Sequence, residues 1–356
     1  MTYRVIQWAT GGVGRAAIEG VLRHPDLELV GCWVHSEEKS GHDVGELVGI
    51  EPIGVRATTS MDEVLALDAD CVVYAPLLPV EDEVAAILRS GKNVVTPVGW
   101  VYPADDQARA IRDACAAGRT TLHGSGIHPG GITEWFPLCV SGVVSAATYV
   151  RAEEFSDIRT YGAPDVVRHI MGFGMSPDEA LASPLASLLE GGFKRSVQMV
   201  VDALGFATDG TVTTAQEVAV AAAPIDSPIG VIEPGQVAAR RFRWDARVGD
   251  QVVVTAAVNW LMGDEDLDPD WSLGDAGERF EVEVRGDPSV TLTFKGLQPE
   301  TVEAGLVRNE GVVATAMHCI NAIPLVCDAE PGIKTYLDLP VVTGRAAPSL
   351  GAGRVA

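Results

Sequence analysis

An apolar strand, a glycine-rich turn and a helix follow one another at the beginning of this chain. Tyr3–Trp8 is strand-like and leads into the turn Ala-Thr-Gly-Gly-Val-Gly at residues 9–14. Arg15–His24 then places apolar residues at the spacing of a helix, and Leu27–Val34 is a second apolar strand. This βαβ arrangement restricts the fold more than any other feature of the sequence, because a glycine-rich first turn is typical of a dinucleotide-binding domain.

The alternation of strands and helices continues to about residue 130. Short apolar strands are expected at 70–75, 93–96 and 120–124, and helices at 79–90 and 105–117. Such alternation predicts an α/β Rossmann domain with a doubly wound parallel sheet.

The turn carries the fingerprint G-x-G-x-x-G with alanine at its first position. Ala9 and Thr10 precede Gly11, which lets the backbone approach a pyrophosphate, and Gly14 lets the helix pack closely on the strand. Gly12 and Val13 lie at the helix N-terminus, where backbone N–H groups favour phosphates. A dinucleotide is therefore the expected cofactor.

The segment after the second strand bears on the choice between NADP and NAD. NAD-selective domains place an acid at the end of this strand, and none stands there in this sequence. The residues available to surround a 2′-phosphate are Arg15, His35, Ser36 and Lys39. We expect NADP, while NAD remains open because Glu37 or Glu38 is close enough in sequence to reach the ribose.

Two further strand ends are expected at the ligand-binding edge of the sheet. Tyr74, Ala75 and Pro76 follow one strand, and Thr96, Pro97 and Val98 follow another. Because ligands of open α/β sheets bind at the carboxyl ends of the strands, these two segments are predicted to line the nicotinamide ribose.

The second half of the chain has a different pattern. Helices are expected around 163–171, 177–189 and 194–204, with a break at Glu190–Phe193, and long strands follow from residue 215 to residue 295. This pattern predicts an α+β substrate and dimerisation domain with a largely antiparallel sheet and one helix-covered face. The open face favours a homodimer.

Several segments also resemble a known family. They are Gln7–Arg15, Gly91–Val95, Gly124–Gly130 and Asn321–Pro324, and together they resemble the 2,4-diaminopentanoate dehydrogenase and native amine dehydrogenase group. The N-terminal part is also similar to dihydrodipicolinate reductases. The resemblance implies hydride exchange between NAD(P)H and a small ketone, imine or amine that binds between the domains. It also implies a C-terminal helix, ending at Pro324, that returns to the Rossmann domain with Asn321 near the cofactor.

The sequence departs from that family at two places. Family members usually carry a glutamate after Asn-Val-Val, taken as the acid–base residue, but Thr96–Pro103 contains no carboxylate. The family's Asn-Pro-Gly is His-Pro-Gly at 128–130. The missing glutamate leaves open an alternative function, a dinucleotide-binding sensor or regulatory subunit without turnover.

Three residues are candidates for the missing proton donor. His128 follows a strand in a glycine-rich loop that is expected to expose it, and its ordinary pKa of about 6.5 suits proton transfer. Tyr102 and Glu134 are the other candidates. Each has a structural alternative: His128 as a hinge, Tyr102 as a packing residue, and Glu134 as a solvated or helix-dipole partner. Five residues of the second domain also have side chains suited to a cleft, although structural roles are favoured: Arg151, Glu153, Glu154, Tyr161 and His169.

Composition excludes some classes of partner. The net charge of −23 repels nucleic acids and anionic membranes, and we identify no apolar run of about 18 residues that would span a membrane.

No leader precedes the first strand, so the cytoplasm is the expected compartment. The six cysteines form no C-x-x-C pair, and no metal site is expected.

The expected domain boundaries follow from these patterns. Residues 1–130 form the Rossmann domain, 131–310 the substrate and dimerisation domain, 311–343 the returning C-terminal segment, and 344–356 a disordered tail.

Overall fold

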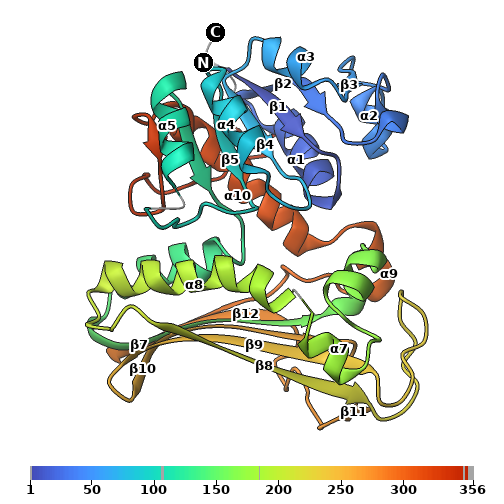
Figure 1. Ribbon diagram of the computed structural model, residues 1–356, viewed down its shortest axis with the longest axis vertical. Coiled ribbons are helices and arrows are strands. Elements are labelled where there is room, and N and C mark those ends of the chain that lie inside the picture. Colours follow the sequence, from blue (N-terminus) through green and yellow to red (C-terminus); the bar gives the residue numbers. More distant parts are fainter. Residues whose placement is uncertain (1, 106–107, 184, 348, 352–356) are drawn as a thin grey trace. The chain divides into compact units, whose positions relative to one another are not determined.

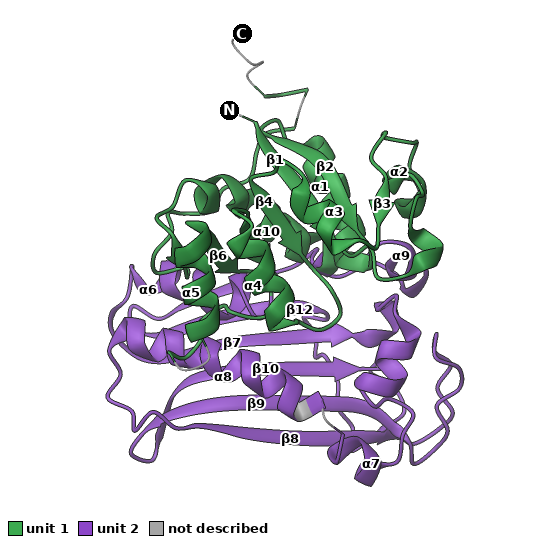
Figure 2. Ribbon diagram, turned by 45° about the horizontal axis from the view of Figure 1, so that its top comes forward, with its two compact units in different colours: residues 1–127, 312–356 green, residues 128–311 purple. Residues whose placement is uncertain are grey.

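The computed structural model describes residues 2–105, 108–183, 185–347 and 349–351. The chain divides into two compact units (Figure 2). Unit 1 comprises residues 1–127 and 312–356, and unit 2 comprises residues 128–311. The tail expected at residues 344–356 lies partly outside the described residues.

Unit 1 contains a seven-stranded sheet in the order β14-β6-β5-β4-β1-β2-β3. Its strands are β1 (Tyr3–Trp8), β2 (Leu27–Trp33), β3 (Ala57–Thr58), β4 (Cys71–Tyr74), β5 (Asn93–Thr96), β6 (Thr121–Gly124) and β14 (Gly332–Ile333). Every pairing between them is parallel. The chain order reverses at β1, which lies between β4 and β2. This confirms the predicted doubly wound sheet.

Helices pack on both faces of this sheet (Figure 1). They are α1 (Gly12–Arg23), α2 (Val44–Val48), α3 (Met61–Ala66), α4 (Glu81–Arg89), α5 (Arg109–Gly118) and α10 (Glu310–Cys327), while the short helix η1 (Glu37–Lys39) is exposed. Unit 1 has two hydrophobic clusters, and successive side chains of β1 point into different ones. Val5 packs with residues of α1 and α10, whereas Ile6 packs with residues of α4 and α5.

Helix α10 runs further than its sequence predicts. The expected end at Pro324 is wrong, because the helix continues through this residue to Cys327. Ile323 and Val326 are both fully buried on either side of the proline. A proline removes one backbone hydrogen bond, and burial of the flanking apolar side chains offsets that loss.

One helical stretch in the described part of the chain, Val302–Cys327, has the length and composition of a possible membrane span. That test is also passed by core helices, and α10 supplies buried residues such as Cys319 and Ile320 to the core of unit 1. Its apolar composition is therefore explained by packing on the parallel sheet.

Unit 2 is built on a second seven-stranded sheet, in the order β11-β8-β9-β10-β7-β12-β13. The strands are β7 (Ser145–Asp157), β8 (Val212–Ala221), β9 (Val237–Val248), β10 (Gln251–Leu261), β11 (Leu267–Asp268), β12 (Arg279–Asp287) and β13 (Val290–Phe294). All pairings are antiparallel except that of β10 with β7, which is parallel. The predicted, largely antiparallel sheet is confirmed.

The remaining helical segments belong to unit 2. They are η2 (Gly131–Trp135), α6 (Phe136–Ser141), η3 (Ile158–Thr160), η4 (Val166–Ile170), α7 (Pro177–Leu181), α8 (Leu185–Leu204) and α9 (Val302–Val307). Helix α8 lies over one face of the sheet (Figure 1), and its Phe193 and Val197 share a core with Phe242 and Val258 of the strands.

The expected helix break at Glu190–Phe193 is wrong, because α8 is continuous there. Phe193 is buried, and a Cβ added to Gly192 would lie 3.2 Å from Cγ of Pro129. The glycine therefore provides room for a neighbouring loop instead of ending the helix.

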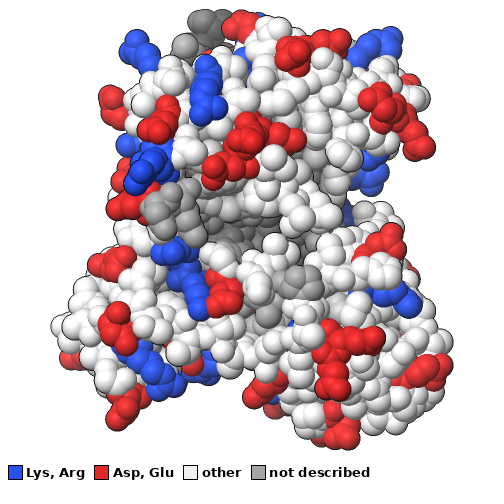
Figure 3. Space-filling view, in the orientation of Figure 1, with Lys and Arg blue, Asp and Glu red and all other residues white. Residues whose placement is uncertain are grey.

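The face of this sheet opposite α8 carries a network of ion pairs. Arg151 contacts the carboxylates of Glu153, Glu281 and Glu283, the latter two at 2.9 and 3.2 Å. These four side chains are between 17% and 20% exposed. Acidic side chains elsewhere are spread over the visible surfaces of both units (Figure 3), which agrees with the negative net charge.

Candidate active site

The glycine-rich turn joins β1 to α1 in an unusual backbone conformation. Ala9 has φ of +71°, in the left-handed region that glycine adopts at lower cost. Two hydrogen bonds hold this turn: the amide of Gln7 donates to the Ala9 carbonyl at 3.0 Å, and Ala9 N–H donates to the Trp33 carbonyl at 2.8 Å. The sequence did not lead us to Gln7, although a polar residue within an otherwise apolar strand indicates that its side chain holds a nearby polar group.

The two glycines at the fingerprint's later positions face different surroundings. A Cβ on Gly14 would lie 2.2 Å from the Ala9 carbonyl oxygen, so only glycine lets α1 start this close to β1. A Cβ on Gly11 would have no atom of the described chain within 4 Å. The space beside Gly11 is therefore open to a ligand, while the space beside Gly14 is filled.

The first turn of α1 is free to face an anion. Gly11 is its N-cap, no side chain caps the helix, and no acid lies in the first turn. The backbone N–H groups near Gly12 and Val13 and the positive end of the helix dipole therefore favour a phosphate at this point.

The segment after β2 approaches the same turn. Lys39, in η1, donates from Nζ to Oγ1 of Thr10 at 3.2 Å. The His35 ring lies 6.1 Å from that of Trp33, which stacks on Trp8 at 4.6 Å. The exposed ammonium group of Lys39 is thus held at Thr10 of the turn. The sequence alone showed only that Lys39 follows the second strand.

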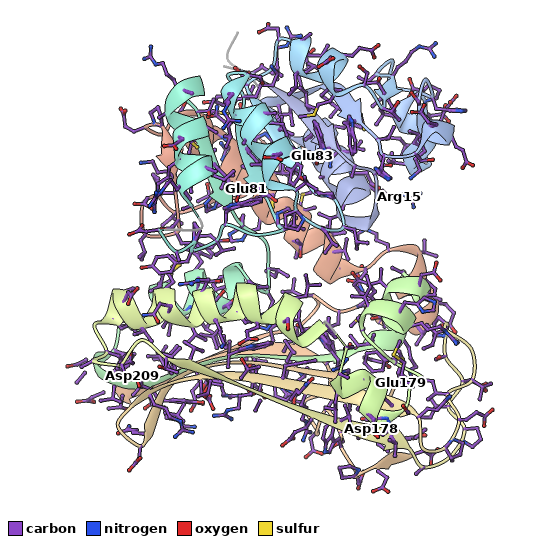
Figure 4. All side chains as sticks on the ribbon, in the orientation of Figure 1. Arg15, Glu81, Glu83, Asp178, Glu179 and Asp209 are labelled. Atoms are coloured by element: carbon purple, nitrogen blue, oxygen red, sulfur yellow. The ribbon has the colours of Figure 1, made fainter. Side chains whose placement is uncertain are left out.

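The surroundings of the turn also include Arg15, Ser36 and two acids. Arg15 lies on α1 and is exposed (Figure 4), and Ser36 precedes η1. Glu37 and Glu38 are the first residues of η1, and both are exposed. Of the four expected 2′-phosphate ligands, Lys39 contacts the turn through its side chain, and the two acids that would suit NAD are exposed beside it in the chain.

The Tyr74 side chain has a structural role at the end of β4. It is fully buried, and its hydroxyl donates to Glu83 of α4 at 2.7 Å and accepts from Val80 N–H at 3.0 Å. Burial raises the pKa of this phenol well above its ordinary value. Ala75, which follows it, is buried, and Pro76 is half-buried.

At the end of β5, a buried side chain likewise forms a hydrogen bond within its own part of the chain. Thr96 is fully buried, and its hydroxyl accepts from the N–H of Val98 at 3.1 Å. Pro97 and Val98 are half-buried at this strand end, and Tyr102 is half-buried in the loop that follows.

Asn321 of α10 is half-buried, and its amide lies 3.8 Å from the Cβ position of Gly344. Next to this helix, sequence reasoning missed a polar cluster. His318 Nδ1 lies 2.7 Å from the Gly126 carbonyl, and Tyr336 lies 3.1 Å from the Ser125 hydroxyl. This cluster fixes the loop that follows β6.

His128 occupies an interior position that differs from the expected exposed one. Its side chain is 1% exposed, and its ring lies 4.9 Å from the ring of Phe193 and 5.6 Å from that of Phe280. Nε2 lies 3.4 Å from the Ala257 carbonyl. Burial lowers the pKa of His128 to about 3, so the imidazole is neutral at physiological pH. The loop does not expose this ring because aromatic residues from distant parts of the chain cover it.

Glu134 is also buried, on η2. Its Oε2 accepts from the N–H of Gly130 at 2.6 Å, and Oε1 has no partner among the described residues. Burial raises the pKa of this carboxyl to about 7, against the opposing effect of Ser196 and Thr133. The expected solvated position is therefore wrong, because the carboxyl lies inside unit 2 and supports the His-Pro-Gly loop.

Comparison with known proteins agrees with this geometry. Residues 133–348 match the 2,4-diaminopentanoate dehydrogenase C-terminal domain, and residues 5–108 match the dihydrodipicolinate reductase N-terminus. An amine dehydrogenase from Streptomyces virginiae is 32% identical, covering 94% of this chain and 96% of the relative. A 2,4-diaminopentanoate dehydrogenase from Acetoanaerobium sticklandii is 23% identical, covering 95% and 93%. The solved amine dehydrogenase from Mycobacterium smegmatis shares the fold, with a TM-score of 0.77, 20% identity and coverage of 97% and 98%.

The parallel sheet, its glycine-rich turn and these matches define a dinucleotide-dependent oxidoreductase. More particularly, the chain belongs to the 2,4-diaminopentanoate dehydrogenase family. The residues present fit the dinucleotide that this family implies, because Gly11 leaves open the space that a pyrophosphate needs.

The two glycines of the turn give a matched pair of variants. Gly11→Ala should leave the melting temperature unchanged, because the new methyl group meets nothing in the chain, but it should weaken NADPH binding roughly tenfold or more by occupying the pyrophosphate space. Gly14→Ala should destabilise the protein by about 3 kcal/mol, because its methyl group collides with the Ala9 carbonyl. Thermal unfolding and fluorescence titration with NADPH measure both. Unchanged NADPH affinity in Gly11→Ala would contradict the assignment of this space.

Proposed function

We propose that this protein is an NADP-dependent oxidoreductase that exchanges a hydride with a small ketone, imine or amine. The observation that carries the cofactor preference is the 3.2 Å contact of Lys39 with Thr10, which holds a cation over the glycine-rich turn. A 2′-phosphate is a dianion at neutral pH, so NADP gains more from this cation than NAD does. NAD remains the competing cofactor through Glu37 or Glu38.

The proposed cofactor site combines the turn, the segment after β2, two strand ends and α10. Its residues are Ala9, Thr10, Gly11, Gly12, Val13, Gly14, Arg15, His35, Ser36, Lys39, Tyr74, Ala75, Pro76, Thr96, Pro97, Val98 and Asn321. Tyr74 and Thr96 contribute by shaping their loops, because their hydroxyls are engaged within unit 1.

The substrate class rests on the named relatives. The similar proteins are called amine dehydrogenase and 2,4-diaminopentanoate dehydrogenase, so we propose an amine or imine substrate, or the corresponding ketone with ammonia. When bound, the dinucleotide supplies or accepts the hydride.

We assign the three expected proton-donor candidates different roles. His128 positions its loop, because a neutral imidazole enclosed by two phenyl rings is poorly suited to donate a proton at neutral pH. Glu134 supports the same loop through Gly130. Tyr102 remains a candidate donor from the loop after β5.

We also propose a homodimer in the cytoplasm. The half-buried ion pairs around Arg151, on the sheet face opposite α8, suit a second copy of the chain. All six cysteines are free thiols, which favours a reducing compartment.

Lys39→Ala tests the preference for NADP. Loss of a charge-assisted contact at an exposed site should weaken NADPH binding about tenfold and leave NADH binding nearly unchanged. Glu38→Gln is the comparison: it should leave NADPH binding unchanged, and a loss of NADH binding would show that Glu38 contacts the ribose. Equal losses of both dinucleotides in Lys39→Ala would remove the argument from the 2′-phosphate.

A turnover assay tests the reaction itself. The protein with NADPH and a panel of small ketones should consume NADPH only when ammonium is present if it acts as an amine dehydrogenase. Consumption without ammonium would indicate carbonyl reduction. Binding of NADPH without turnover of any ketone or amine would favour the sensor, the alternative that the missing glutamate supports.

A further inference from the structure

The loop that follows β6 is held by side chains from the C-terminal part of the chain. Nδ1 of His318, on α10, donates to the carbonyl of Gly126 at 2.7 Å, since a carbonyl oxygen can only accept. The hydroxyl of Tyr336 lies 3.1 Å from that of Ser125 and 3.3 Å from the same nitrogen of His318. All four residues belong to unit 1, which is green in Figure 2. Two consecutive loop residues thus depend on partners 192 and 211 residues further along the chain.

The segment that carries Tyr336 is itself fixed in place. Strand β14 pairs with β6, and Nδ1 of His123, on β6, donates to the carbonyl of Lys334 at 2.7 Å. The buried Tyr336 ring stacks on that of His318 with centroids 5.5 Å apart and meets the His123 ring edge-on at 5.1 Å. Burial lowers the pKa of both imidazoles, to about 4 for His123. Both rings are therefore neutral donors at neutral pH.

The loop after β6 is joined in turn to the proposed cofactor residues at the end of β5. The N–H of Ser125 donates to the Thr96 carbonyl at 2.8 Å, and the Thr96 hydroxyl accepts from the N–H of Val98 at 3.1 Å. A Cβ on Gly124 would lie 2.3 Å from the Gly99 carbonyl oxygen, so only glycine lets the two loops approach this closely. A displacement of the loop after β6 would therefore move the end of β5 as well.

The place of this loop in the sheet relates it to one half of a dinucleotide. In Rossmann domains the dinucleotide crosses the point where the strand order reverses, so that each half of the sheet carries one half of the cofactor. Here the glycine-rich turn follows β1, and Lys39, proposed to bind the 2′-phosphate, follows β2. Strands β4, β5 and β6 lie on the other side of β1. Their carboxyl ends are therefore where the nicotinamide half is expected.

We propose that His318 and Tyr336 are positioning residues for the nicotinamide half of the cofactor. By holding Gly126 and Ser125, they keep the loop after β6 against the end of β5. This inference rests on the proposed dinucleotide-dependent function. The adenosine half, on the other side of β1, does not depend on them.

Two substitutions of His318 separate its hydrogen bond from its bulk. His318→Asn places an amide N–H near the position of Nδ1 and should keep the bond to Gly126, whereas His318→Gln reaches the position of Nε2 and should lose it. We expect His318→Gln to bind NADPH about fivefold more weakly than the wild-type protein and His318→Asn to stay within about twofold of it.

A fragment of the cofactor shows which half is affected. Adenosine 2′,5′-bisphosphate carries the adenine and the 2′-phosphate but neither the nicotinamide nor its ribose. Its affinity, measured by calorimetric titration beside that of NADPH, should be the same in the wild-type protein and in both His318 variants. A purely structural role would lower the melting temperature without distinguishing the two ligands.

Tyr336→Phe keeps the stacked ring and removes the hydroxyl that contacts Ser125. It should weaken NADPH binding about threefold and leave binding of the bisphosphate unchanged, and it tests the inference even where His318→Gln does not fold. His24→Gln is the control for general destabilisation. His24 is a buried histidine that ends α1 and accepts from the N–H of Asp26 at 3.2 Å. Its substitution should lower the melting temperature and change neither affinity.

The outcomes are distinguishable. If the wild-type protein binds NADPH, the proposed function stands, and three results would each overturn the positioning role. They are equal losses of NADPH and bisphosphate affinity in His318→Gln, equal losses of NADPH affinity in His318→Asn and His318→Gln, and unchanged NADPH affinity in both His318→Gln and Tyr336→Phe. Failure of the wild-type protein to bind either NADPH or NADH would overturn the proposed function, and this inference with it.

Discussion

The close approach of α1 to β1 is the constraint on which the candidate cofactor site depends. A single methyl group on Gly14 would lie 2.2 Å from the Ala9 carbonyl, so the helix can start where it does only because that methyl group is absent. The same turn holds Ala9 in a left-handed conformation and fixes its carbonyl with Gln7. The open space at Gly11 and the contact of Lys39 with Thr10 follow from this arrangement, since both depend on where the turn is held.

The carboxylates of unit 2 have different partners on the two faces of its sheet. On one face the carboxylates of Glu281 and Glu283 pair with arginines, which lower their pKa values despite the opposing effect of burial. On the face beneath α8, Glu154 forms no ion pair with a lysine or arginine among the described residues, and burial raises its pKa to about 7. Because side chains alternate along a strand, Arg151 and Glu154 lie on opposite faces, and the pKa values of the carboxyls on these faces are shifted in opposite directions.

The sequence predicted the two sheets because their signals are local: apolar strands alternate with helices in one half, and long strands separated by turns fill the other. Local signals failed where distant packing prevails. The glycines in Glu190–Phe193 and the proline at Pro324 were expected to end helices, but both helices continue, with buried side chains such as Phe193 and Ile323 next to these positions. Likewise, the expected exposure of His128 was wrong, because Phe193 and Phe280, from distant parts of the chain, cover its ring.

The central claim is that unit 1 binds NADP through the glycine-rich turn and the cation beside it. The most direct test is a parallel fluorescence titration of the wild-type protein with NADPH and NADH at the same ionic strength. The account predicts that both bind and that NADPH binds about tenfold tighter or more, equivalent to about 1.4 kcal/mol. Equal affinities, tighter binding of NADH, or no binding of either dinucleotide would contradict it.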